Sequence, residues 1–135
     1  MKMFQAIKTA ASGLSAERLR LDLIASNIAN IRTTRTEGGE LYRRKTAVFA
    51  AVLAKNAAGQ GVRVAAINEQ QTAPRWEYDP THPDANEEGY VAYPNINLLQ
   101  EMTDMVTATR AYEANVTVLN AGKSIFLKAL EIGRG

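Results

Sequence analysis

Residues 98–119 have the sequence LLQEMTDMVTATRAYEANVTVL, and this stretch decides the fold class. Apolar side chains recur in it at alternating steps of four and three residues, and the pattern continues to the end of the chain. Asn97 precedes the stretch as a helix N-cap, Gln100 follows three residues later, and Gly133 stands at the far end. We therefore expect a helix over about residues 98–132. Its apolar row consists of Leu98, Met102, Met105, Thr109, Tyr112, Val116, Leu119, Lys123, Phe126 and Leu130, with Thr109 and Lys123 as polar breaks.

The N-terminal residues repeat this spacing. Asn27 and Asn30 are poor residues for the middle of a helix, and Gly38 and Gly39 follow. We therefore expect a first helix over about residues 4–31, roughly 40 Å long at 1.5 Å per residue. Its apolar row, interrupted at Glu17, consists of Met3, Ile7, Ala10, Leu14, Leu21, Ile24, Ile28 and Ile31.

The two helices are expected to pack against each other. Each has an apolar side that would not be stable alone in water, so we expect a coiled pair, either parallel or antiparallel. A flanking stripe of Val118, Ile125 and Ile132 widens the apolar side of the second helix beyond what one partner covers. The remaining surface is expected to meet neighbouring subunits, and head-to-tail contacts that do not close would build a helical tube or rod.

The middle of the chain carries strand and turn signals. Residues 46–53 and 61–65 are predicted strands, joined through a turn at 56–61 as a hairpin. Residues 73–94 hold all four prolines and are expected to form an irregular loop. The predicted fold class is therefore mainly α with a small β-containing middle. Residues 1–32 and 97–135 together would form a helical core domain, and residues 33–96 a separate middle segment.

The composition leaves little for catalysis or metal binding. The absence of cysteine excludes disulfides, thiolate metal sites and a cysteine nucleophile. His82, the only histidine, lies among carboxylates that a divalent cation would use, but the Asp-Pro and His-Pro steps favour a polar turn, and an EF-hand is not matched. We expect no enzyme activity, no cofactor and no metal; the carboxylates of this loop are Asp79, Asp84, Glu87 and Glu88. Trp76 is expected to anchor the loop by packing, and a role at an interface comes second.

The charge is unevenly distributed along the 135 residues, a length typical of one domain. Residues 1–46 carry nine Lys and Arg against four acids, and residues 68–104 carry one Arg against eight acids, although the net charge is only +2. Such a chain attracts copies of itself or relatives in an ordered way, so the acidic segment is expected to face outward or to meet the basic segment of a neighbour. No apolar stretch is long enough for a transmembrane helix, and the N-terminus lacks the apolar region of a signal peptide.

Two other functions are weighed beside a structural one. A nucleic-acid-binding coiled coil would use the basic residues after the first helix and would lose DNA affinity steeply with salt. An enzyme would use the His82 loop and would lose its activity in a His82→Ala variant. The basic residues of the first alternative are Arg32, Arg35, Arg43, Arg44 and Lys45.

Several separated motifs resemble the axial proteins of the bacterial flagellum, the family of rod, hook and hook-associated proteins. At the N-terminus these are ASGLSA at 11–16, LDLIASNIAN at 21–30 and TTRT at 33–36. At the C-terminus NLLQEM at 97–102 and ATRAYEANV at 108–116 are similar to the second signature of the family. The middle, YDPTHPDA at 78–85 and GYVAYPN at 89–95, and the ending KALEIGR at 128–134 resemble proximal-rod proteins most.

This resemblance implies a function and a set of partners. Such proteins leave the cell through the flagellar type III exporter without a cleaved signal and assemble in the periplasm. Their terminal helices form the inner layer of the rod, a helical tube that transmits torque from the inner-membrane ring to the hook. The implied partners are the rod proteins FlgB, FlgF and FlgG, the adaptor FliE, further copies of the chain and the export apparatus, with no nucleic acid and no small-molecule substrate.

The resemblance and the apolar rows together indicate an assembly interface. Asn27 and Asn30 are expected to bond to the backbone of another subunit, with local helix termination as the alternative. On that hypothesis Asn27→Leu impairs assembly more than folding. The expected interface residues are Ser12, Gly13, Leu14, Leu21, Ile24, Asn27, Ile28, Asn30, Met102, Met105, Arg110, Tyr112, Glu113, Asn115, Val116, Leu119, Phe126 and Leu130.

Overall fold

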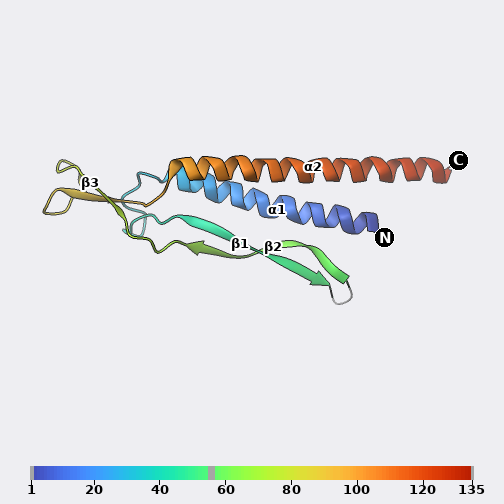
Figure 1. The fold of residues 1–135 in the computed structure, drawn as a ribbon, viewed down its shortest axis with the longest axis horizontal. Helices are drawn as coiled ribbons and strands as arrows, with labels where there is room; N and C mark the ends of the chain where they lie inside the picture. The colour runs from blue at the N-terminus through green and yellow to red at the C-terminus, as the bar shows by residue number, and fades with distance from the viewer. Residues whose placement is uncertain (1, 55–56, 135) are drawn as a thin grey trace.

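The computed structural model describes residues 2–54 and 57–134 as two long antiparallel helices with two small hairpins between them (Figure 1). Both termini lie at one end of the molecule, and the second hairpin lies at the other end. The predicted fold class is confirmed, and both helices lie within two residues of their expected starts and ends. The elements are α1 (Lys2–Ala29), β1 (Lys45–Ala54), β2 (Ala57–Glu69), β3 (Arg75–Tyr78), β4 (Tyr90–Tyr93) and α2 (Leu98–Arg134).

Side-chain contacts along their length fix the register of the helix pair. The rings of Phe4 and Phe126 meet edge to face, with centroids 5.5 Å apart. Two glycines permit close approach, because a Cβ on either would lie 2.9 Å from a side-chain atom of the other helix. As the residue number rises along α1, that of its partner on α2 falls. The contacting pairs are Phe4 with Phe126, Ile7 with Gly122, Gly13 with Asn115, and Asn27 with Glu101.

The contact row of α2 differs from the predicted one by a rotation of one residue. The prediction is correct for Met105, Tyr112, Val116, Leu119 and Phe126, which are half-buried. It is wrong for Leu98, Met102 and Leu130, which are exposed, as are the predicted breaks Thr109 and Lys123. The other half of the row is formed instead by residues spaced seven apart, namely Glu101, Ala108, Asn115 and Gly122. Small and polar side chains give no apolar signal in a sequence, yet they let the two backbones come close.

The predicted hairpin of β1 and β2 is confirmed and packs against α1. Its strands are longer than expected and pair antiparallel from Lys45 opposite Glu69 to Ala54 opposite Ala57. The turn expected at 56–61 is replaced by strand from residue 57 onward, and residue 56 lies outside the described residues. The Oγ of Ser12 on α1 accepts a hydrogen bond of 3.0 Å from the N–H of Val62. At this contact Gly61 has φ +141°, and a Cβ there would overlap the Ser12 hydroxyl.

The proline-rich segment is not the irregular loop that we expected. Its two short strands, β3 and β4, pair antiparallel from Arg75 opposite Tyr93 to Tyr78 opposite Tyr90. The four prolines stand outside the strands, in the connection or at the flanks, so they break no ladder. The Asn86 side chain orders the connection by accepting the N–H groups of Glu88 and Tyr90. We refer to residues 75–93 as the tongue.

The buried core is small and partly polar. Val91 and Ala108 are fully buried, and so is Glu101, with Asn27 only 1% exposed. A buried carboxylate and amide are costly unless they are hydrogen-bonded, so their partners determine how the helices and hairpin are joined. Among the described residues, no helix has the length and apolar character needed to cross a membrane.

Candidate functional site

Asn27 occupies the corner where α1, α2 and the start of β1 meet. Its Nδ2 donates to the Lys45 carbonyl at 2.9 Å and to Glu101 Oε2 at 3.3 Å. Its Oδ1 accepts the Lys45 N–H and the Tyr42 hydroxyl, each at 2.9 Å. The amide makes the four hydrogen bonds that it has room for. The bond to another subunit that the sequence suggested is therefore replaced by bonds within the chain.

Glu101 is held by an arginine from the segment before β1. Arg44 Nε donates to Glu101 Oε1, and Arg44 Nη2 donates to Asp104 Oδ2 at 3.3 Å. The side chain of Glu101 is 1% exposed and that of Arg44 is 18% exposed. A carboxylate so deeply buried remains favourable only while its cationic partner and hydrogen bonds stay in place. We call the set Asn27, Tyr42, Arg44, Lys45, Glu101 and Asp104 the polar junction.

Asn30 makes local contacts at the end of α1, in agreement with helix termination, the alternative to a bond with another subunit. Its Nδ2 donates to the Ser26 carbonyl at 2.8 Å, and its Oδ1 accepts the Thr33 hydroxyl at 3.0 Å. These bonds serve backbone and side-chain groups at the end of α1, where helical bonding stops. The Ser26 hydroxyl lies 3.0 Å from that of Tyr42 and connects this end to the polar junction.

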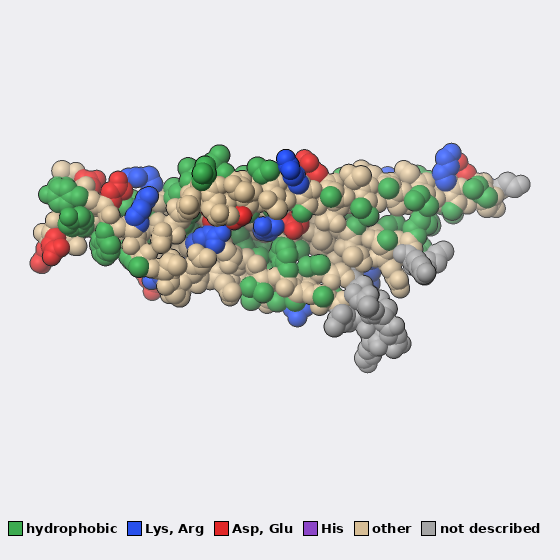
Figure 2. Space-filling view, in the orientation of Figure 1, with side chains coloured by type: hydrophobic (Ala, Val, Ile, Leu, Met, Phe, Trp, Pro, Cys, Tyr) green, Lys and Arg blue, Asp and Glu red, His purple; other side chains and the backbone are tan. Residues whose placement is uncertain are grey.

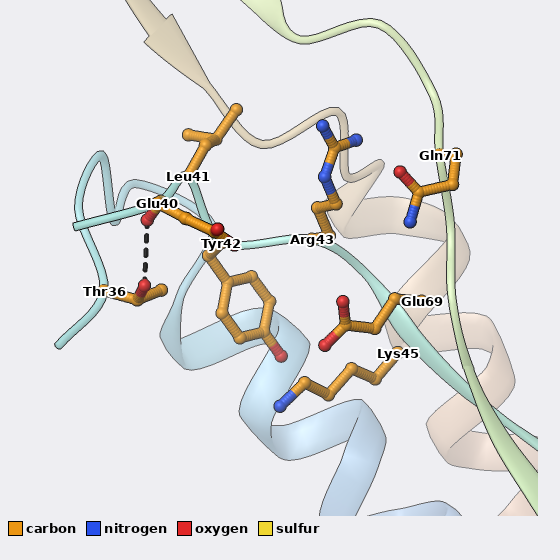
Figure 3. Close-up of a pocket in the computed structure, with 8 residues that line it drawn as sticks. All are labelled: Thr36, Glu40, Leu41, Tyr42, Arg43, Lys45, Glu69 and Gln71. Atoms are coloured by element: carbon orange, nitrogen blue, oxygen red, sulfur yellow. Dashed lines mark hydrogen bonds between the residues drawn. The ribbon is translucent and has the colours of Figure 1, made fainter. Parts of the chain in front are cut away.

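A cavity of about 610 Å³ opens beside the polar junction. Figure 3 shows Tyr42, Lys45 and Glu69 on one side of it, and Arg43 and Gln71 on the other. The polar and charged groups come from the segment that leads into β1, from Lys45 at its start, and from the end of β2 and the residues after it. Among the described residues, no group of three or more His, Asp or Glu side chains could hold a metal ion, in this cavity or elsewhere.

The tongue is attached to the chain by opposite charges. Arg35 Nη2 and the Thr34 hydroxyl both donate to Asp84, each at 2.6 Å. The Thr34 hydrogen bond lowers the pKa of Asp84 most, and the positive charge of Arg35 lowers it further against an opposing effect of burial. At this point the acidic middle segment meets the basic segment of the same chain. The sequence predicted such an ion pair between neighbouring molecules, whereas here it forms within one molecule.

Tyr93 and Arg32 form a second attachment. The Arg32 guanidinium lies 4.7 Å from the centre of the Tyr93 ring, and its Nη2 donates to the Tyr93 hydroxyl at 3.2 Å. Arg32 also lies 3.8 Å from the carboxylate of Glu77. This arrangement buries Tyr93 and fixes how the tongue leaves the helix pair.

These contacts weaken the two other functions. Three of the basic residues proposed for nucleic acid, Arg32, Arg35 and Arg44, are paired with carboxylates. The Nδ1 of His82 accepts the backbone N–H of Asp84 at 3.0 Å, so this ring nitrogen has a structural partner. The basic segment and the histidine loop both serve to attach the tongue.

The expected interface residues fall into two groups. Most are buried or half-buried within the chain, and Ser12 binds the hairpin. Four are exposed, namely Met102, Arg110, Glu113 and Leu130. The half-buried or buried members are Ser12, Gly13, Leu14, Leu21, Ile24, Asn27, Ile28, Asn30, Met105, Tyr112, Asn115, Val116, Leu119 and Phe126.

Two exposed apolar surfaces stand out. The stripe expected on α2 is open to solvent, with Ile132 81% exposed and Val118 and Ile125 exposed as well. The second surface is on the tongue, where Trp76 is 56% and Tyr78 64% exposed. The packing role expected for Trp76 is therefore wrong, because strand alternation turns its ring away from the chain. Figure 2 shows hydrophobic side chains at the tongue end and along α2.

Comparisons with known proteins agree with these features. A family model described as "Flagella basal body rod protein" matches residues 7–35, and one described as "Flagellar basal body rod FlgEFG protein C-terminal" matches residues 87–132. The chain is 45% identical to the flagellar basal-body rod protein FlgC of Borreliella burgdorferi, with 100% of both chains covered. It is 45% identical to the Bacillus subtilis FlgC and 40% to that of Escherichia coli O157:H7, covering 99% of this chain and 100% of each relative.

Proposed function

The chain belongs to the FlgC family of flagellar basal-body rod proteins, and from this premise we propose that it is a structural subunit of the proximal rod of the bacterial flagellar basal body. The observation that carries the proposal is the extent of the similarity. It runs over the whole chain and so includes both helices, the hairpin of β1 and β2, and the tongue.

The exposed surfaces support a role in a polymer. An antiparallel helix pair with apolar side chains left on its outer side has surface to bury against neighbours. Met102, Arg110, Glu113 and Leu130 are the expected interface residues that face outward, and we assign them to contacts with other subunits. Contacts between unlike patches that do not close into a ring produce a helical tube.

The position and route of the subunit follow from the same proposal. The rod lies in the periplasm, and the chain reaches it through the flagellar type III system without a cleaved signal. Its neighbours are FlgB, FlgF, FlgG and FliE, along with further copies of itself. Residues 1–32 and 97–135 act as the helical core of the tube, and residues 33–96 as a middle segment outside it. The subunit has no enzyme activity and takes part in transmitting torque to the hook.

The polar junction gives the subunit a means of bearing load. Arg44 precedes β1, and Glu101 and Asp104 lie in the first turns of α2, so their ion pairs tie the middle segment to the helix pair. A force applied to the hairpin would reach α2 through these pairs as well as through the backbone.

Electron microscopy of basal structures from cells that lack the gene tests the proposal. We expect inner-membrane rings without rods or hooks, and restoration of both when the gene is supplied in trans. Intact rods and normal swimming in the deletion strain would contradict it. The control is a strain complemented with a chain that ends before α2, which we expect to remain without rods.

A further inference from the structure

The tongue has two unlike faces. The side chains of Val91 and Tyr93 point to one face, and they are 0% and 2% exposed. The side chains of Trp76 and Tyr78 point to the other, with Tyr90 opposite Tyr78 across the strands. We call Trp76, Tyr78 and Tyr90 the aromatic face; all three are exposed.

The aromatic face is ordered before anything covers it. The rings of Tyr78 and Tyr90 meet edge to face with centroids 5.3 Å apart. Gly89 has φ +88°, and a Cβ there would lie 2.8 Å from Tyr78 Cε2, so glycine makes room for the ring. Ordered tyrosine and tryptophan side chains lose little entropy on binding and are enriched among the residues that dominate interfaces.

The tongue carries more negative than positive charge. Residues 75–93 contain five acids and one basic residue, Arg75. Asp84 and Glu77 pair with arginines that attach the tongue, whereas Glu87 and Glu88 are exposed and have no ion pair among the described residues. An occupant of the aromatic face therefore has to present apolar side chains together with positive charge.

The last three turns of α2 have that combination. We call residues 123–134 the α2 tail; α1 begins opposite Phe126, so the end of the tail has no partner helix. The tail exposes Lys123, Lys128 and Arg134 against a single acid, Glu131, whose carboxylate lies 3.6 Å from Lys128 in an exposed pair. Its exposed apolar side chains are Ile125, Leu127, Leu130 and Ile132.

The two surfaces cannot meet within one chain. The tongue lies beyond the start of α2, and the α2 tail is at the opposite end of the molecule (Figure 1). A helix of 37 residues spans roughly 55 Å at 1.5 Å per residue. A contact between them joins two copies through unlike patches, and when each copy uses its tongue on one neighbour and its tail on another, the contacts extend into a helical polymer.

We propose that the aromatic face of one copy binds the α2 tail of a second copy, with Glu87 and Glu88 facing Lys123 and Lys128. The inference rests on the proposed function, because it assigns one of the contacts by which the rod subunit polymerises. Aromatic and aliphatic side chains supply the buried area, and the charges set which end of the partner is accepted.

Cysteine cross-linking tests this contact in cells, since the chain has no cysteine of its own. A variant with Tyr78→Cys and Ile132→Cys, expressed in the deletion strain, is expected to form disulfide-linked dimers and higher species in isolated basal bodies. The matched control pairs Tyr78→Cys with Val106→Cys, which is also exposed on α2 but lies outside the tail. Each single-cysteine variant controls for contacts between like sites.

Charge reversal provides a second, independent readout. Glu87→Lys with Glu88→Lys is expected to reduce the disulfide cross-link between positions 78 and 132, and adding Lys123→Glu with Lys128→Glu is expected to restore it. If the two substitutions in the tongue had only unfolded it, the two substitutions in the α2 tail would not restore the cross-link.

The outcomes separate this proposal from the proposed function. Basal bodies that contain the protein but show no more cross-linking than the Val106→Cys control would overturn the contact and leave the rod function standing. Cross-linking of the α2 tail to a different rod protein would contradict the proposal that the partner is a second copy of this chain. Absence of the wild-type protein from isolated rods would instead refute the proposed function itself.

Discussion

The side-chain amide of Asn27 donates a hydrogen bond of 3.3 Å to the carboxylate of Glu101, 74 residues further along the chain. Both side chains are buried, and both also hold the segment that leads into β1. This single pair joins the first helix, the second helix and the hairpin. Removing either side chain therefore affects three elements at once.

Asn27→Leu is expected to destabilise the fold by about 3 kcal/mol, because it leaves buried backbone and side-chain groups without hydrogen-bond partners. This reverses the expectation from the sequence that assembly would suffer more than folding. Urea unfolding followed by circular dichroism measures the effect. Asn120→Leu, at an exposed position of α2, is the control. Equal midpoints for the two variants would contradict the role of Asn27.

Arg44→Ala is expected to cost about 3–5 kcal/mol, because it leaves the buried Glu101 carboxylate without its cation. The double variant Arg44→Met with Glu101→Leu is expected to recover most of that loss, since both charges are then absent. The measurement is the free energy of unfolding of each of the two variants. A double variant no more stable than Arg44→Ala would contradict the cost assigned to the unpaired charge.

Gly122→Val is expected to destabilise the helix pair by about 1–3 kcal/mol through overpacking. A Cβ added at Gly122 would lie 2.9 Å from Cγ1 of Ile7 on α1, and valine adds two methyl groups beyond the Cβ. Helix propensity acts in the other direction, because valine is the better helix former. Thermal unfolding of Gly122→Val and of Ala121→Val, at the exposed neighbouring position, gives the comparison; equal melting temperatures would argue against the close approach.

Acid is expected to release the tongue. The pKa of Asp84 is lowered in the folded chain, chiefly by the Thr34 hydrogen bond and also by Arg35. A carboxyl whose pKa is lower when folded stabilises the fold above its unfolded pKa of about 3.9, and this contribution is lost as the pH falls through the folded value. Fluorescence of Trp76, the only tryptophan, reports the change. Asp84→Asn is expected to remove this acid transition, and an unchanged transition would assign it to another group.

The helices were predictable because each carries a long apolar repeat, with the Asn97 cap at the start of α2 and Gly38 and Gly39 beyond the end of α1. The hairpin of β1 and β2 was predictable from its β-branched alternation. These signals are local, and each is repeated several times within the element that it specifies.

The contact row and the polar junction were not predictable from apolar spacing alone. Ala108 and Gly122 lie at heptad positions with Glu101 and Asn115. A row drawn through the large apolar residues Met102, Val116 and Leu130 passes through the neighbouring Thr109 and Lys123 instead. The partners of Asn27 and Glu101 come from segments far apart in sequence, so no local pattern reports them. A row of small and polar residues spaced by seven is the signal in the chain that would have identified the contact row.

The tongue was missed for a different reason. Each of its strands has four residues, too few for a clear alternation, and prolines flank them. It is attached through Arg32, Thr34 and Arg35, whose partners in the tongue lie 61, 50 and 49 residues further along the chain. Exposure of Trp76 follows from strand register, which the sequence did not reveal.

The antiparallel order of the helices has a consequence for how the molecule folds. Every partner of α1 on α2 lies in the last 35 residues of the chain, and the pairing of Phe4 with Phe126 joins residues near the two ends. Contacts this distant in sequence form slowly, because closing so long a loop costs chain entropy before the contacts can form. For a polypeptide delivered from its N-terminus, the first helix has no partner helix until almost the entire length has emerged. The helix pair is therefore completed last, close to the place where the chain comes to rest.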